Sequence, residues 1–132
     1  MIQARLGNQR DTVRILIVDD DRRVRQSLAG LISLREGLSV VGATGDVDRV
    51  LELVTSERPD VVLVDLAPSE DPIGVALLRQ LSERWPALVL VAMSVCRDGA
   101  STALAAGADA FISKDSNHEE IGEALAALFT ND

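Results

Sequence analysis

The sequence predicts an α/β domain in which one parallel β-sheet is covered by helices on both faces. Short runs of consecutive apolar residues, typical of strands buried on both faces, alternate five times with segments of helical periodicity. The connections are short, so right-handed crossovers place all the strands in one doubly wound, three-layer sheet domain. The expected strand order is 2-1-3-4-5, and ligands bind such sheets at the switch point between strands 1 and 3.

The first half of the chain contains two strand and helix pairs. In order, the pattern predicts a strand at Val13 to Val18, a helix with Val24, Leu28, Leu31 and Ile32 inward that Gly37 stops, a strand at Leu38 to Ala43, and a helix with Val47, Val50, Leu51 and Val54 inward. Asp46 or Asp48 is expected to cap the second helix. The arginines Arg22, Arg23 and Arg25 are expected to form a solvated face of the first helix.

The second half adds three strands and three helices. In order, the pattern predicts a strand at Val61 to Val64, a loop at Ala67 to Pro72, a helix from Gly74 that ends before Trp85 and Pro86, a strand at Leu88 to Met93, a helix at Gly99 to Ala106 stopped by Gly107, a strand at Ala110 to Ile112, and a final helix with Ile121, Leu125, Leu128 and Phe129 inward. Ser116 or Asn117 is expected to cap the final helix.

The composition indicates one well-packed domain in a reducing compartment. Hydrophobic residues make up 47% of the 132 residues, and residues 13–132 are expected to fold behind a flexible leader at residues 1–12. A net charge of −8 disfavours direct binding to nucleic acid or to an anionic membrane. A single cysteine, Cys96, and the lack of a long apolar run predict a cytoplasmic protein without a membrane span.

Carboxylates gather at the ends of two strands that are expected to be neighbours. Asp19, Asp20 and Asp21 follow the first strand, and Asp65 follows the third. At a separation of about 4 Å and an effective dielectric of about 20, each like-charge pair costs about 4 kcal/mol. Such a cluster therefore predicts a bound divalent cation and a nucleophilic aspartate.

Two further strand ends add groups suited to phosphoryl chemistry. Ser94 follows the fourth strand, and Lys114, the only lysine among 13 basic residues, follows the fifth. Mg²⁺ prefers carboxylate and carbonyl oxygens, and an aspartate can attack phosphorus to form an acyl phosphate. An ammonium and a hydroxyl would stabilise the charge on the phosphoryl oxygens.

These features resemble the receiver domain of two-component response regulators, a family with a flavodoxin-like (βα)5 fold, over Val13 to about Phe129. Four segments carry the resemblance: Ile15 to Asp20, Val64 to Leu66, Met93-Ser94, and Gly107 to Asp115. The sequence Lys114-Asp115-Ser116 is similar to that of receivers that precede a LuxR-type helix-turn-helix domain.

The resemblance implies a role for each residue of the site. Asp65 would be the phosphoacceptor, with Mg²⁺ as cofactor and a histidine kinase as phosphodonor. The metal ligands would be Asp19, Asp20, Asp65 and the carbonyl of Ala67, whereas Asp21 is expected to be a helix cap. Lys114 would bind phosphate, and Ser94 and Phe111 would be the switch residues. Signals would leave through the face formed by the fourth helix, fifth strand and fifth helix, including by homodimerisation, and the domain would not be an enzyme.

Three positions depart from the family pattern. Pro68 lies three residues after Asp65, where the family usually has proline four residues on. Val95 follows the switch hydroxyl in place of Ala or Gly, and Ala67 and Cys96 are uncharged at positions that tune acyl phosphate lifetime. We therefore expect phosphorylation with atypical rates.

Two alternatives remain open at this point. The chain could be a receiver-like binding module that phosphorylation does not control. It could also be a haloacid-dehalogenase-type phosphohydrolase, because Asp19 and Asp21 have the Asp-x-Asp spacing of that family. Against this, Arg22 and Arg23 stand where that family has a Gly-Thr pair.

Overall fold

The structure, a computed structural model, describes residues 12–67, 70–114 and 118–129. Within these residues, five strands alternate with α-helices and one short 3₁₀ helix. In chain order the elements are β1 (Val13–Val18), α2 (Arg22–Ser33), β2 (Leu38–Thr44), α3 (Val47–Glu57), β3 (Val61–Asp65), α4 (Pro72–Arg84), β4 (Val89–Ser94), η1 (Arg97–Gly99), α5 (Ala100–Ala106), β5 (Ala110–Ser113) and α6 (His118–Phe129).

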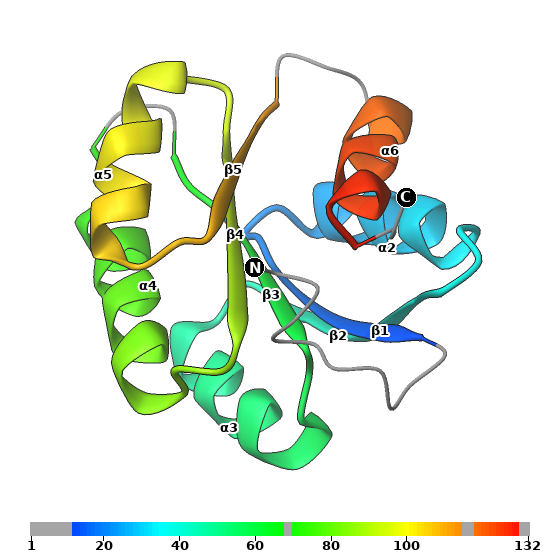
Figure 1. Cartoon of the computed structure of the whole chain (residues 1–132), viewed down its shortest axis with the longest axis horizontal. Helices are drawn as coiled ribbons and strands as arrows, with labels where there is room; N and C mark the ends of the chain where they lie inside the picture. Colours follow the sequence, from blue (N-terminus) through cyan, green and yellow to red (C-terminus); the bar gives the residue numbers. More distant parts are fainter. Residues whose placement is uncertain (1–11, 68–69, 115–117, 130–132) are drawn as a thin grey trace.

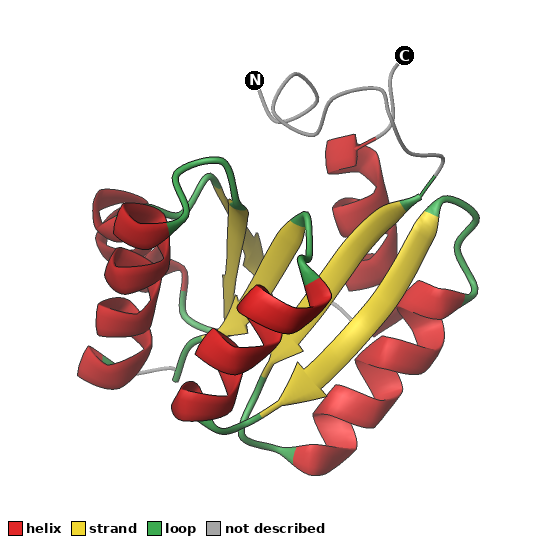
Figure 2. Ribbon diagram, turned by 90° about the horizontal axis from the view of Figure 1, so that it is seen from below, coloured by secondary structure: helices red, strands yellow, loops and turns green. Residues whose placement is uncertain are grey.

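The strands form one parallel sheet in the order β2-β1-β3-β4-β5, which confirms the predicted topology. Helices α2 and α6 cover one face, and α3, α4 and α5 cover the other (Figures 1 and 2). None of the described helices is long and apolar enough to cross a bilayer.

Successive residues of the central strands point to opposite faces of the sheet, so they contribute in turn to two hydrophobic cores, one on each face. Leu16 and Val62 pack with the cluster under α3, α4 and α5. Ile15 and Leu63 pack with the cluster under α2 and α6. Because residues 15–18, 61–64 and 89–93 of β1, β3 and β4 are buried on both faces, these stretches are continuous apolar runs rather than alternating ones.

The predicted strands are confirmed, with small differences at their ends. Strands β2, β3 and β5 extend one residue further, to Thr44, Asp65 and Ser113, and β4 is shifted by one residue to Val89–Ser94. Polar residues therefore pair in the sheet at its carboxyl edge, which an apolar pattern does not detect. Residues 1–11 of the expected leader at residues 1–12, and the expected caps Ser116 and Asn117, lie outside the described residues.

Helix boundaries differ where local hydrogen bonds decide them. Helix α4 begins at Pro72 rather than Gly74, because Asp71 caps it and proline suits the first helical position. Helix α2 ends at Ser33, so Gly37, with φ 89°, lies in the turn before β2 rather than stopping the helix. Asp46 caps α3, as one of the two expected alternatives.

Candidate functional site

Asp19 and Asp65 lie side by side at the carboxyl edge of the sheet. Val18 of β1 is the register partner of Val64 of β3, so the next residues along these parallel strands are neighbours. Both groups are shielded from water: Asp19 is 2% exposed, and the Asp65 side chain is 14% exposed. The structure thus brings together two of the carboxylates that the sequence placed at adjacent strand ends.

Lys114 completes this pair of carboxylates from the end of β5. Its backbone N–H donates a hydrogen bond of 2.8 Å to the carbonyl of Ser94, which fixes the residue beside β4. Its Nζ lies 2.9 Å from Oδ2 of Asp65 and 3.7 Å from Oδ2 of Asp19. One ammonium group therefore faces two buried or nearly buried carboxylates.

The surroundings of Asp65 favour the protonated form of its carboxyl group. Burial raises the pKa of Asp65 from 3.8 to about 7, Lys114 acts in the opposite direction, and the neighbouring Asp19 adds to the rise. The charged form of Asp65 is thus favoured only when positive charge lies beside it.

The side chain of Asp19 is oriented by the backbone of the turn that follows β1. Oδ1 of Asp19 accepts a hydrogen bond of 2.9 Å from the N–H of Asp21. Asp21 in turn caps α2, because its side chain accepts from the backbone N–H groups of Arg23 and Val24. This confirms the prediction that Asp21 is a helix cap, and it leaves Oδ2 of Asp19 directed to the site.

Asp20 is not shielded from solvent as Asp19 and Asp65 are. Its side chain is exposed, although it lines the same cavity as both of them, with a volume of about 710 Å³. In the described part of the chain, no three His, Cys, Asp or Glu side chains converge as metal ligands. The described residues therefore bring together a pair of carboxylates, Asp19 and Asp65, rather than the expected close cluster of three.

The rim of this cavity is partly apolar. Ile73, at the start of α4, is 69% exposed, and Val95, directly after β4, is 51% exposed. Both residues line the cavity together with Lys114. The β-branched side chain of Val95, which departs from the family pattern, thus lies on the exposed rim of the cavity.

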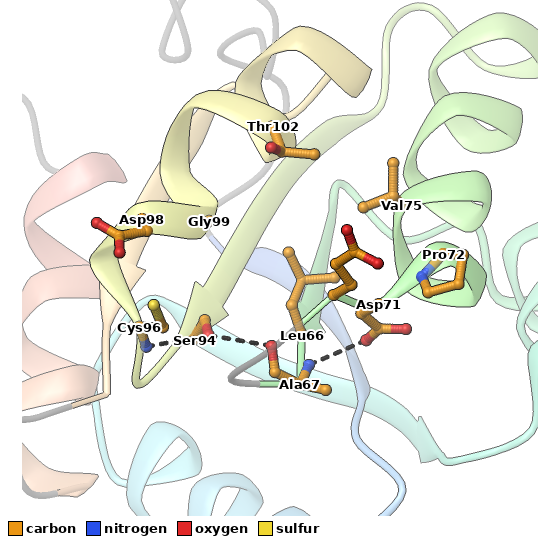
Figure 3. Close-up of a pocket in the computed structure, with 11 residues that line it drawn as sticks. Leu66, Ala67, Asp71, Pro72, Val75, Ser94, Cys96, Asp98, Gly99 and Thr102 are labelled. Atoms are coloured by element: carbon orange, nitrogen blue, oxygen red, sulfur yellow. Dashed lines mark hydrogen bonds between the residues drawn. The ribbon is translucent and has the colours of Figure 1, made fainter.

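Ser94, the last residue of β4, is buried and contacts the loop after β3. It is 1% exposed, and its Oγ donates a hydrogen bond of 3.4 Å to the carbonyl of Ala67 and accepts one of 3.2 Å from the N–H of Cys96. The N–H of Ala67 donates to Oδ2 of Asp71 at 2.9 Å (Figure 3). The Ala67 carbonyl that was expected to bind metal is therefore hydrogen-bonded to the expected switch hydroxyl.

Phe111 lies within β5, the strand that ends just before Lys114. It is the register partner of Ala92 in β4, is partly buried, and packs against the cluster under α3, α4 and α5. A pocket of about 500 Å³ lies between the carboxyl edge of the sheet, α4 and α5, and Ser94 and Ala67 line it (Figure 3). Ser94 and Ala67, which share a hydrogen bond, thus form part of the wall of this pocket.

The donor atoms of the carboxylate pair fit a small, hard cation. Oδ2 of Asp19 and Oδ1 of Asp65 are buried and have no hydrogen-bond partner among the described residues. Leaving such oxygens without a partner is costly, and a divalent cation held by oxygen ligands would satisfy both. This chemistry, rather than a complete ligand set, is what the residues offer to a metal.

Residues 15–126 match the response regulator receiver domain family. The chain belongs to this family. This receiver domain is 41% identical over 121 residues to the response regulator MprA of Mycolicibacterium vanbaalenii, covering 88% of this chain and 50% of that protein. This match argues against the phosphohydrolase alternative. It identifies the chain as a receiver domain of two-component signalling, which is a signalling domain rather than a classical enzyme.

Two solved structures show how closely this receiver domain follows the fold. The signal receiver domain of the response regulator NarL from Mycobacterium tuberculosis is 27% identical, with a TM-score of 0.76 over 90% of this chain and 97% of that one. A LuxR-family two-component response regulator from Aurantimonas sp. is 29% identical, with a TM-score of 0.77 over 89% and 84%. The chain spans half or less of the length of the curated relatives it matches.

Sequence reasoning missed two residues that shape this receiver site. Asp71 holds the N–H groups of Ala67 and Gly74, and the sequence Asp71-Pro72 at a helix start was a signal for such a cap. Arg25 was expected on a solvated face, but its guanidinium donates a hydrogen bond to the carbonyl of Asp19. No sequence pattern distinguishes it from Arg22 and Arg23.

Proposed function

We propose that this receiver domain accepts a phosphoryl group on Asp65 from the phosphohistidine of a histidine kinase, in a reaction that depends on Mg²⁺ and takes place in the cytoplasm. The observation that supports the proposal most strongly is the 2.9 Å contact between Oδ2 of Asp65 and Nζ of Lys114 beside the buried carboxylate of Asp19. A carboxylate and a cation at a cavity 710 Å³ in volume suit an anionic group that arrives from solvent.

The residues that would hold Mg²⁺ are Asp19, Asp20, Asp65 and the carbonyl of Ala67. Asp19 and Asp65 supply the two buried oxygens that lack hydrogen-bond partners among the described residues. Bound Mg²⁺ would supply positive charge that offsets the repulsion between the carboxylates and the charge on the phosphoryl oxygens.

In the proposed reaction, a carboxylate oxygen of Asp65 attacks phosphorus. The new O–P bond forms as the N–P bond to the donor histidine breaks, and the histidine nitrogen leaves with the electron pair. Lys114 would then donate a hydrogen bond to a phosphoryl oxygen, since its Nζ already lies within 2.9 Å of the attacking carboxylate.

The signal would leave through Ser94 and Phe111. The Ser94 hydroxyl would turn from the Ala67 carbonyl to the phosphoryl group, and Phe111 would follow on the neighbouring strand. The responding face would be α5, β5 and α6, where Leu104 of α5 is 47% exposed and available for a homodimer contact. With a net charge of −8, this domain would not itself bind DNA.

The test is to incubate the protein with acetyl phosphate and Mg²⁺ and to locate the phosphoryl group by mass spectrometry. We expect one phosphoryl group per chain, on Asp65, and no labelling of the Asp65→Asn variant. Labelling that survives in Asp65→Asn but is lost in Asp19→Asn would contradict the assignment. A folded protein that takes up no phosphate would instead favour the binding module without phosphorylation control.

A further inference from the structure

Arg25 reaches back from the first turns of α2 to the end of β1. Its Nη1 donates a hydrogen bond of 2.6 Å to the backbone carbonyl of Asp19. Among the described residues, the guanidinium forms no salt bridge within 4.0 Å of a carboxylate, although three aspartates lie just before the helix. The charge of Arg25 is thus directed to the backbone of the acidic turn and not to its side chains.

Gly45 provides the space in which this contact forms. The carbonyl of Thr44 accepts a hydrogen bond of 3.0 Å from the N–H of Asp19, so the turn after β2 lies against the turn after β1. A Cβ atom built on Gly45 would lie 2.9 Å from Nη1 of Arg25, 2.8 Å from Cα of Asp20 and 3.0 Å from the carbonyl oxygen of Asp19. Any side chain at position 45 would therefore displace the guanidinium of Arg25 or the backbone of Asp19 and Asp20.

We infer that Arg25 is a positioning residue for the metal-binding turn, held in place by the close approach of Gly45. Asp19 is fixed at three points: its N–H by Thr44, its carbonyl by Arg25, and its Oδ1 by the N–H of Asp21. Together these contacts fix the direction in which Oδ2 of Asp19 points, and they fix the position of the next residue, Asp20, at the cavity. This inference rests on the proposed Mg²⁺ site.

The two roles that Arg25 could have predict opposite results. If the guanidinium acted only as a nearby positive charge, its removal would tighten Mg²⁺ binding. If it orients the ligands, its removal should weaken Mg²⁺ binding by about 10-fold or more, since loss of groups that orient metal ligands typically costs about 10 to 100-fold in metal affinity.

The experiment compares Arg25→Ala with Arg23→Ala, which removes the same charge from an exposed side chain in the first turn of the same helix. Mg²⁺ affinity is measured by calorimetry, and exchange of the Asp21 amide is measured by NMR without metal. Arg25→Ala should weaken Mg²⁺ binding about 10-fold and speed amide exchange at Asp21, and Arg23→Ala should change neither. Arg25→Lys should restore part of the affinity.

Gly45→Ala perturbs the same turn from the side of β2. It should also weaken Mg²⁺ binding, because the added Cβ would press on Cα of Asp20 and on the carbonyl of Asp19 as well as on Nη1 of Arg25. Unchanged exchange at Asp21 together with unchanged or tighter Mg²⁺ binding in Arg25→Ala would overturn the inference. If the unmutated protein bound no Mg²⁺, the proposed function would fail, and the exchange measurement would still decide the role of Arg25.

Discussion

Replacement of Lys114 by alanine is expected to lower the rate of Asp65 phosphorylation by acetyl phosphate by about 100-fold or more. Removal of one positioned donor from a site of developing charge typically costs about 100 to 1,000-fold in rate. Nζ of Lys114 lies 2.9 Å from the carboxylate that would attack, and the Lys114 side chain is only 15% exposed, so water does not replace it easily. Phosphate incorporation over time, at saturating Mg²⁺, measures the effect.

The same substitution should also destabilise the protein, by about 2 to 4 kcal/mol at pH 8, because it leaves two shielded carboxylates facing each other. The variant Lys114→Ala/Asp65→Asn separates this effect from chemistry. It should regain most of the lost stability and stay unphosphorylated. A Lys114→Ala protein that is phosphorylated at the unmutated rate would show that this ammonium has no part in the reaction.

Replacement of Asp65 by asparagine is expected to stabilise the metal-free protein, and more so at high pH. An ordinary aspartate carboxyl group has a pKa of 3.8, whereas burial raises the pKa of Asp65 to about 7 in the folded chain. Between these values unfolding releases a proton, so the stability of the unmutated protein falls as pH rises through this window, and the penalty levels off above pH 7. Asparagine carries no charge at any pH and escapes the penalty.

The advantage of Asp65→Asn should therefore grow by about 2 kcal/mol between pH 5.5 and pH 8. Urea denaturation in the presence of EDTA at the two pH values measures it. Glu83→Gln, which removes one negative charge from an exposed position on α4, is the control and should show no such growth. An advantage that stays constant or shrinks as pH rises would contradict the assigned environment of Asp65.

The arrangement of the sheet followed from patterns that burial imposes on the sequence. Continuous apolar runs such as Val61 to Val64 mark strands covered on both faces, and chain order with right-handed crossovers then limits the strand order. Boundaries were harder, because they depend on single hydrogen bonds. The start of α4 is set by Asp71, whose side chain accepts from Gly74 and Ala67.

The site was predictable to the extent that strand ends define it. Asp19, Asp65 and Lys114 meet because the register of β1 with β3, of β3 with β4 and of β4 with β5 brings the strand ends together. The exposure of Asp20 was not predictable, because it depends on how the turn after β1 folds. The contact of Arg25 with a backbone carbonyl leaves no trace in the sequence either, because it depends on how two turns pack.

A Mg²⁺ titration followed by thermal unfolding at pH 8 tests most directly whether the two shielded carboxylates share a cation. For a dissociation constant on the order of 1 mM, 10 mM Mg²⁺ would add about 1.4 kcal/mol of stability and raise the Tm by about 5 °C. We expect this rise for the unmutated protein relative to NaCl of equal ionic strength, and its loss in Asp19→Asn and in Asp65→Asn. No rise in the unmutated protein, or an equal rise in Asp19→Asn, would contradict a metal site between these residues.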